Sequence, residues 1–151
     1  MKRIMFVCHG NICRSPMAEF VMKDLVEKSG RAEEFFIASS AVSAEEIWGE
    51  IGNPVYRPVQ ALLAARGISC AGKRATQLVR ADGENYDVFY CMDDSNLRRA
   101  KSILGAKNEG KCCKLLSVLG TSADVADPWY TRDFERSYRE IYAACQAILE
   151  E

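Results

Sequence analysis

The chain has 151 residues, about the size of one domain that buries its own core. Hydrophobic residues make up 48% and charged residues 27%, a balance typical of a globular protein and not of a disordered one. A formal net charge of −1 gives no reason to expect nucleic acid or an anionic membrane as a partner. Any anion site must therefore be built locally.

The N-terminus and the cysteines both indicate a reducing compartment. The apolar run at residues 4–9 is too short for a signal-peptide core and far too short to cross a bilayer. Seven cysteines without a secretion signal are expected to be free thiols. His9 is the only histidine and no C-x-x-C pair occurs, so no metal site is expected. We therefore expect a cytoplasmic protein that uses no metal and no cofactor.

Apolar runs of strand length alternate with stretches of helical periodicity along the whole chain. In chain order the pattern predicts a strand at 2–8, a helix at 16–29, a strand at 35–40, a helix at 54–66, a strand at 86–92, a helix from an N-cap at Ser95 to about residue 104, a strand at 113–119 and a helix at 134–150. This order predicts an α/β fold, with one domain over residues 1–151 and a four-stranded parallel sheet that has helices on both faces. Ligands bind at the carboxyl ends of such strands, which points to the loop after the first strand.

The segment VCHGNICRSP, residues 7–16, joins the first predicted strand to the first predicted helix. Gly10 and Asn11 tolerate backbone conformations in which successive N–H groups turn inward around an anion. The helix that follows adds its unpaired N-terminal amides, and Pro16 suits the first helical position. Arg14 can grip two oxygens of one phosphate group with its planar guanidinium. The segment is therefore predicted to be a phosphate-binding loop.

Cys8 is the predicted nucleophile, because positive surroundings favour the thiolate form of a cysteine. The segment resembles the phosphate loop of the low-molecular-weight protein tyrosine phosphatases, whose pattern is V-C-x-G-N-x-C-R-S-P, and the resemblance covers essentially the whole chain. It implies hydrolysis of phosphotyrosine in proteins, or of small aryl phosphates, through a phosphocysteine intermediate, with inorganic phosphate as product. Beside the catalytic Cys8 and Arg14, the implied phosphate-binding loop comprises His9, Gly10, Asn11, Ile12, Cys13 and Ser15.

The sequence ADPWY at residues 126–130 matches the Asp-Pro-aromatic motif of the same family. Asp127 is the predicted general acid, which protonates the phenolic oxygen as it leaves. As a carboxylate it then deprotonates the water that releases phosphate from sulfur. Trp129 and Tyr130 are expected to form an aromatic wall beside the substrate ring, and Asp124 is the alternative acid.

Other residues are expected to support or border the site. The resemblance implies that Asn11 holds the loop through side-chain hydrogen bonds and that Ser39, at the end of the second strand, is its partner. Lys73 stands where the family often has a histidine, so the support at that corner is expected to differ. Trp48, in the segment 43–53, is expected at the rim of the pocket.

Two loop residues each have two interpretations. Cys13 is expected either to pack under the loop or to trap an oxidised Cys8 as a reversible disulfide. His9 is interpreted as a variable position that touches substrate, not as a catalytic base. Adjacent side chains in a tight loop usually point apart, and no second histidine is present.

Three other functions compete with phosphotyrosine hydrolysis. An arsenate reductase on the same fold needs two further cysteines near the third strand, where only Cys91 lies. Phosphoarginine phosphatases of this family tend to have threonine at the position of Ile12, whose aliphatic side chain favours phosphotyrosine. A catalytically inactive phosphate-binding module is disfavoured by the joint presence of Cys8, Arg14 and Asp127.

Overall fold

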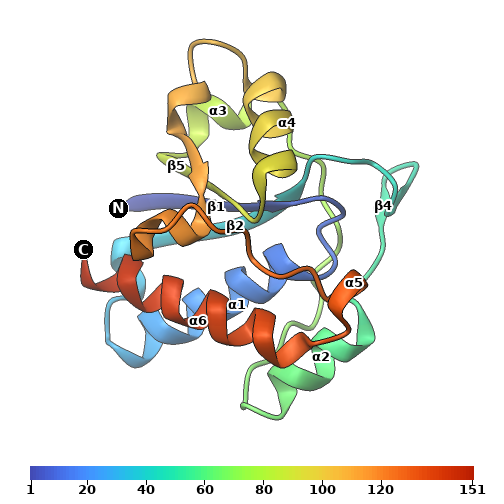
Figure 1. Ribbon diagram of the computed structural model, residues 1–151, viewed down its shortest axis with the longest axis vertical. Coiled ribbons are helices and arrows are strands. Elements are labelled where there is room, and N and C mark those ends of the chain that lie inside the picture. Colours follow the sequence, from blue (N-terminus) through green and yellow to red (C-terminus); the bar gives the residue numbers. More distant parts are fainter.

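The structure, a computed structural model, describes all 151 residues and has a central sheet of four parallel strands in the order β2-β1-β5-β6 (Figure 1). The strands are β1 (Lys2–Cys8), β2 (Phe35–Ala41), β5 (Val88–Cys91) and β6 (Cys112–Lys114). β1 pairs with β2 along its whole length and with β5 on its other side. The predicted α/β class and the four-stranded parallel sheet are confirmed.

Helices cover both faces of the sheet, as predicted (Figure 1). One face carries α1 (Arg14–Lys28), α2 (Arg57–Ala64) and α6 (Phe134–Glu150), and the other carries α3 (Asp82–Asn85) and α4 (Asp94–Leu104). Ile4 and Phe6 of β1 belong to the buried cluster with α1, α2 and α6, whereas Met5 and Val7 belong to the cluster with α4. Because side chains alternate along a strand, β1 must be apolar on both sides, which explains its unbroken apolar run.

Shorter elements lie in the connections. They are an antiparallel pair, β3 (Ile47–Trp48) with β4 (Ile51–Gly52), the short helix α5 (Pro128–Thr131), and three 3₁₀ turns, η1 (Ala32–Glu34), η2 (Glu109–Lys111) and η3 (Leu115–Leu119). The β3–β4 hairpin and α5 border the carboxyl ends of the sheet strands, on the side where β1 ends (Figure 1).

Four sequence-based boundaries need correction. The strand predicted at 113–119 ends at Lys114 and continues as η3, whose Leu115 and Leu116 are buried with α6, since a short apolar run suits a strand or a buried turn equally well. The helix predicted at 54–66 is shorter, Arg57–Ala64. α1 begins at Arg14, so Pro16 is its third residue and not its first. The third position also has no helical partner for its N–H, so a proline, which lacks that group, costs no hydrogen bond there. The N-cap of α4 is Asp93 and not Ser95, since the Asp93 carboxylate accepts the Asn96 amide at 2.8 Å.

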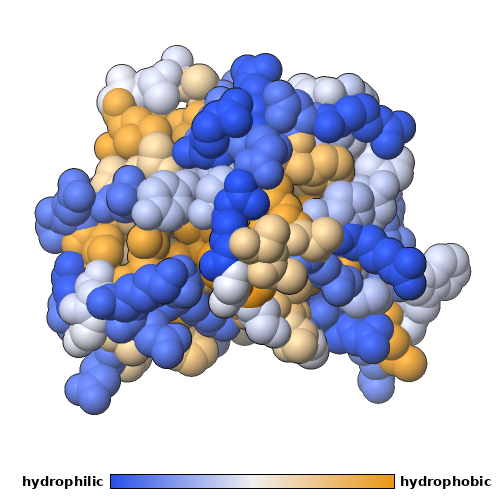
Figure 2. All heavy atoms as spheres, turned by 90° about the horizontal axis from the view of Figure 1, so that it is seen from below, coloured by the Kyte–Doolittle hydropathy of each residue, from blue (hydrophilic) through white to orange (hydrophobic).

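The outer surface carries mixed polarity. On the face seen from below Figure 1, hydrophilic side chains lie across the surface with apolar side chains showing between them (Figure 2). None of the helices combines the length and apolar character that crossing a membrane requires.

Candidate active site

The loop between β1 and α1 places the sulfur of Cys8 at the start of a helix. Cys8 is the last residue of β1 and is 3% exposed, and α1 begins six residues later at Arg14. The Asn11 amide donates to Cys8 Sγ at 3.3 Å, and Ser15 Oγ lies 2.9 Å from the same sulfur. No side chain caps α1, so its first amides remain available to an anion beside the sulfur.

Asn11 holds this loop in a conformation that few residues adopt. Its φ is +58°, in the left-handed region that asparagine tolerates better than most residues. Its Nδ2 donates to Ser15 Oγ at 2.7 Å and to Ser39 Oγ at 2.9 Å, while its Oδ1 accepts the Thr76 amide at 3.0 Å. The structure therefore brings Asn11 and Ser39 together as the sequence predicted.

Beneath Ser39 lies a buried ion pair that the sequence analysis did not foresee. Glu19, in α1, is 4% exposed and accepts a 2.5 Å hydrogen bond from Ser39 Oγ. Lys73 Nζ donates to the Ser39 carbonyl at 3.0 Å and lies 3.4 Å from Glu19 Oε1. Burial lowers the pKa of Lys73, and the nearby Glu19 opposes that shift. Lys73 thus supports the loop from below, through the Ser39 carbonyl and Glu19.

Arg14 is fixed by three acceptors. Its Nη1 donates to the Val125 carbonyl at 2.9 Å, and its Nη2 donates to Asp93 Oδ2 at 2.9 Å and lies 3.4 Å from Asp127 Oδ2. Burial alone would lower the pKa of Arg14, but the charges of Cys8, Asp127 and Asp93 raise it. The guanidinium is therefore charged and oriented, although it is only 3% exposed.

Asp93 is a site residue that the sequence analysis missed. It follows β5, caps α4 and binds Arg14 with its other oxygen. A polar residue directly after a parallel strand is a signal that could have identified it, because the carboxyl ends of the strands meet at one edge of the sheet.

Asp127 comes to the same pocket from the far end of the chain. It caps α5 by accepting the Trp129 amide at 3.0 Å through Oδ1, which leaves Oδ2 toward Arg14. The alternative acid, Asp124, does not line the pocket, since its Oδ1 lies 3.0 Å from Lys114 Nζ.

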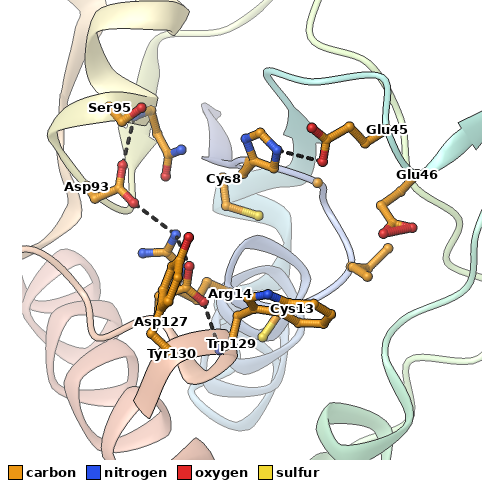
Figure 3. Close-up of a pocket in the computed structure, with 14 residues that line it drawn as sticks. Cys8, Cys13, Arg14, Glu45, Glu46, Asp93, Ser95, Asp127, Trp129 and Tyr130 are labelled. Atoms are coloured by element: carbon orange, nitrogen blue, oxygen red, sulfur yellow. Dashed lines mark hydrogen bonds and ion pairs between the residues drawn. The ribbon is translucent and has the colours of Figure 1, made fainter. Parts of the chain in front are cut away.

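A pocket of about 610 Å³ opens above the sulfur (Figure 3). Its walls are Cys8, His9, Gly10, Ile12, Cys13, Arg14, Glu45, Glu46, Asp93, Ser95, Asn96, Asp127, Trp129 and Tyr130. Nine of the predicted site residues are therefore in the lining, whereas Asn11, Ser15 and Ser39 lie behind it as supports.

The prediction for Trp48 is wrong. Its side chain is 73% exposed and does not line the pocket, and it lies at the end of β3 in the β3–β4 hairpin. The same segment contributes Glu45 and Glu46 to the rim instead, on the side opposite Asp93 and Ser95 (Figure 3).

His9 and Cys13 also line the pocket. His9 Nε2 lies 2.9 Å from Glu45 Oε2, so the His9 ring contacts a glutamate of the pocket rim and not the Cys8 sulfur.

Burial, followed by the negative charges of Cys8 and Asp127, raises the pKa of Cys13 to about 12. Capture of an oxidised Cys8 by Cys13 stays a prediction. No cysteine other than Cys8 and Cys13 lines the pocket, so the structure does not place two further thiols beside Cys8 for an arsenate-reducing relay.

Comparisons with known proteins agree with this fold. A family described as "Low molecular weight phosphotyrosine protein phosphatase" matches residues 3–151. The low molecular weight protein-tyrosine-phosphatase YfkJ of Bacillus subtilis is 37% identical over 151 residues, which cover 99% of this chain and 94% of that protein. The crystal structure of YfkJ has a TM-score of 0.89, with 99% of this chain and 93% of that chain covered. The low molecular weight phosphotyrosine protein phosphatase of Homo sapiens is 36% identical over 157 residues, covering 99% of this chain and 94% of that protein.

The chain belongs to the low molecular weight phosphotyrosine protein phosphatase family, as the loop resemblance predicted. It is therefore a member of a family of hydrolases. A protein with a different substrate also has this fold. The structure of DARP, a Drosophila arginine phosphatase, matches this one with a TM-score of 0.87, covering 99% of this chain and 96% of that chain at 26% sequence identity.

Proposed function

We propose that this chain hydrolyses phosphotyrosine in proteins and small aryl phosphates, with Cys8 as the nucleophile. The observation that carries the proposal is the environment of the Cys8 sulfur. Sγ accepts the Asn11 amide at 3.3 Å and lies 2.9 Å from Ser15 Oγ. Because Asn11 Nδ2 already donates to Ser15 Oγ, the serine hydroxyl is left to donate to sulfur. Two hydrogen-bond donors are therefore directed at the sulfur that attacks phosphorus.

Arg14 is the proposed phosphate clamp. Val125 and Asp93 fix the orientation of its guanidinium before any substrate arrives, so binding costs little reorganisation. The loop amides, the first amides of α1 and Arg14 together would hold the three equatorial phosphoryl oxygens.

The proposed reaction has two displacements at phosphorus. In the first, a sulfur–phosphorus bond forms while the bond to the phenolic oxygen breaks, and Asp127 gives its proton to that oxygen. In the second, the Asp127 carboxylate takes a proton from water, whose oxygen displaces sulfur and releases inorganic phosphate. Ser15 stabilises the thiolate that leaves. The reaction needs neither a metal nor a cofactor.

The remaining expectations follow from this proposal. We infer that residues 1–151 act as one phosphatase domain, which the family match over residues 3–151 supports. The partner is a phosphotyrosine protein, and neither nucleic acid nor a membrane takes part in the reaction. The seven free cysteines support the expected cytoplasmic location, which stays a prediction.

Steady-state kinetics with the purified protein test the substrate class. The ratio kcat/KM for a phosphotyrosine peptide is expected to exceed that for phosphoarginine. A larger value for phosphoarginine would overturn the substrate class and leave the nucleophile in place. The Cys8→Ser variant is expected to lose turnover and still bind orthovanadate in a calorimetric titration. If this variant keeps appreciable activity, Cys8 is not the nucleophile.

The role of Asp127 is tested with a series of aryl phosphates. In the Asp127→Asn variant, kcat for phenyl phosphate is expected to fall about 10²–10⁴-fold, the range typical of general acid catalysis. The loss for p-nitrophenyl phosphate is expected to be smaller, because its leaving group is already stable as an anion. Equal losses for all leaving groups would mean that Asp127 is not the acid.

A further inference from the structure

Lys114, the last residue of β6, joins two segments that carry the site. Its Nζ lies 3.0 Å from Asp94 Oδ1 and 3.0 Å from Asp124 Oδ1, and it donates to the Ser122 carbonyl. The side chain is only 12% exposed, an unusual state for a surface lysine. Hydrogen bonds to Asp124 and Asp94 raise the pKa of Lys114, so it is charged.

Each of the two carboxylate partners of Lys114 adjoins a residue that contacts Arg14. Asp94 is the first residue of α4 and directly follows Asp93, which accepts from Arg14 Nη2. Asp124 directly precedes Val125, whose carbonyl accepts from Arg14 Nη1. The Asp94 amide also donates to Asp124 Oδ1 at 3.2 Å, which is a direct hydrogen bond between the start of α4 and the segment that contains Asp124.

The segment 121–127, which leads to Asp127, has no helix or strand of its own. Its downstream half is tied down by the Val125 amide on the Met92 carbonyl at 2.8 Å and by the Ala126 amide on Glu140 at 2.9 Å. Its upstream half, residues 121–124, makes its hydrogen bonds to the rest of the protein only through Lys114 and the Asp94 amide. Without Lys114, the like charges of Asp94 and Asp124 would face each other and push this half away.

We propose that Lys114 is a positioning residue that holds the segment 121–127 against α4 and so sets the place of Asp127 beside Arg14. An isolated surface ion pair contributes little, but a lysine shared by two carboxylates and a carbonyl forms a network. A small displacement of a catalytic group is costly to the rate, since general acid catalysis requires a proton donor within hydrogen-bond reach of the leaving oxygen. This inference rests on the proposed function, in which Asp127 is the acid.

The test compares Lys114→Met, Lys114→Arg and the control Lys107→Met. Lys107 forms an ion pair with Glu84 alone, its side chain is 78% exposed and it lies outside the site. For Lys114→Met, kcat for phenyl phosphate is expected to fall about 10-fold, part of the full effect of a general acid, with a smaller loss for p-nitrophenyl phosphate and little change in KM. Lys114→Arg is expected to restore most of the rate, and Lys107→Met to match the unmodified enzyme for both substrates.

Two further variants separate the possible outcomes. Asp124→Asn keeps an acceptor for the Asp94 amide but removes the charge that Lys114 holds, so it is expected to show the same dependence on leaving group even if Lys114→Met folds poorly. In the double variant Lys114→Met with Asp127→Asn, the leaving-group dependence is expected to equal that of Asp127→Asn alone. Equal losses for both substrates in Lys114→Met and Asp124→Asn, or no loss in either, would overturn the proposal. If Asp127→Asn itself shows no dependence on leaving group, the acid assignment fails instead.

Discussion

Arg14 Nη2 donates to Asp93 Oδ2 at 2.9 Å, while the other oxygen of the same carboxylate accepts the Asn96 amide at the start of α4. One aspartate therefore couples the orientation of the guanidinium to the end of a helix. Buried residues of α4 pack against the sheet. Asp93 therefore links the Arg14 guanidinium to a helix that the sheet holds in place.

The two functions of Asp93 can be separated by two substitutions. Asparagine is as good an N-cap as aspartate, so Asp93→Asn should keep the cap of α4. Its single carbonyl oxygen then accepts the Asn96 amide and its NH2 group faces Arg14 Nη2, so the hydrogen bond to the guanidinium is lost and kcat/KM is expected to fall about 10-fold. Asp93→Ala should lose about 1 kcal/mol of stability in addition, because the cap is lost. Denaturant unfolding and steady-state kinetics measure both effects, and an equal stability loss in the two variants would contradict this division.

The shape of the guanidinium is expected to matter as much as its charge. Arg14→Lys keeps the charge but places one ammonium where Nη1 and Nη2 now reach separate acceptors, Val125 and Asp93. We expect kcat to fall by at least about 10²-fold, the usual effect of removing one donor that stabilises the transition state. The matched control is Arg136→Lys, at a half-exposed arginine of α6, which should leave the rate unchanged. An active Arg14→Lys enzyme would contradict the clamp.

Asn11 combines a strained backbone with three side-chain hydrogen bonds, and two variants distinguish them. Asn11→Gly removes the side chain but accepts the φ of +58° without strain, whereas Asn11→Ala removes the side chain and keeps the strain. Asn11→Ala is therefore expected to be about 1 kcal/mol less stable than Asn11→Gly, the usual cost of a left-handed residue with a Cβ. Both are expected to lose kcat, since Ser15 and Ser39 each lose a partner. A thermal unfolding midpoint equal in the two variants would show that the backbone conformation contributes nothing.

The phosphate loop was predictable because its parts are neighbours in the sequence. A strand end, a glycine, an asparagine and a helix start within ten residues determine one local conformation, and Cys8 and Arg14 lie at its two ends. Asp127 was found through its motif. By contrast, the Arg14–Asp93 contact joins residues 79 positions apart. In the sequence alone, an aspartate at the start of a helix is equally well explained as a helix N-cap. Only tertiary structure shows that Asp93 has both functions.

Trp48 shows why a residue at the correct loop was assigned wrongly. Its segment does reach the pocket rim, but the rim contacts come from Glu45 and Glu46, three and two residues earlier. In the antiparallel pair Trp48 stands opposite Ile51, and both side chains are exposed. The register of the β3–β4 pair determines which side chains of this segment face the site. Strands of two residues each are too short for that register to be predicted from the sequence.

The acidic rim is expected to weaken the binding of dianionic substrates. Besides Arg14, the charged side chains of the pocket are all carboxylates, and Asp93 and Asp127 are already paired with Arg14. That leaves Glu46, together with Glu45 beside His9 Nε2, to repel a phosphate monoester as it enters. Two exposed charges at such distances in water change a binding free energy by about 1 kcal/mol at most, so replacing both with glutamine should lower KM about 3-fold with little change in kcat.

The glutamine variants keep the local structure, which makes the comparison specific to charge. Glu46 Oε2 accepts from Asn53 Nδ2 at 2.8 Å, and a glutamine carbonyl can still accept that bond. Glu45 Oε2 lies 2.9 Å from His9 Nε2, and a glutamine can also form a hydrogen bond with that ring nitrogen. The control is Glu50→Gln, which removes an exposed charge from the same hairpin outside the pocket and should leave KM unchanged. The difference between the rim variant and the unmodified enzyme should shrink as salt rises, because screening shortens the range of exposed charges to about 8–10 Å at 0.1–0.15 M. A lower KM that persists unchanged at high salt would instead indicate a change in the shape of the pocket, and an unchanged KM at low salt would show that the rim charges do not act on the substrate.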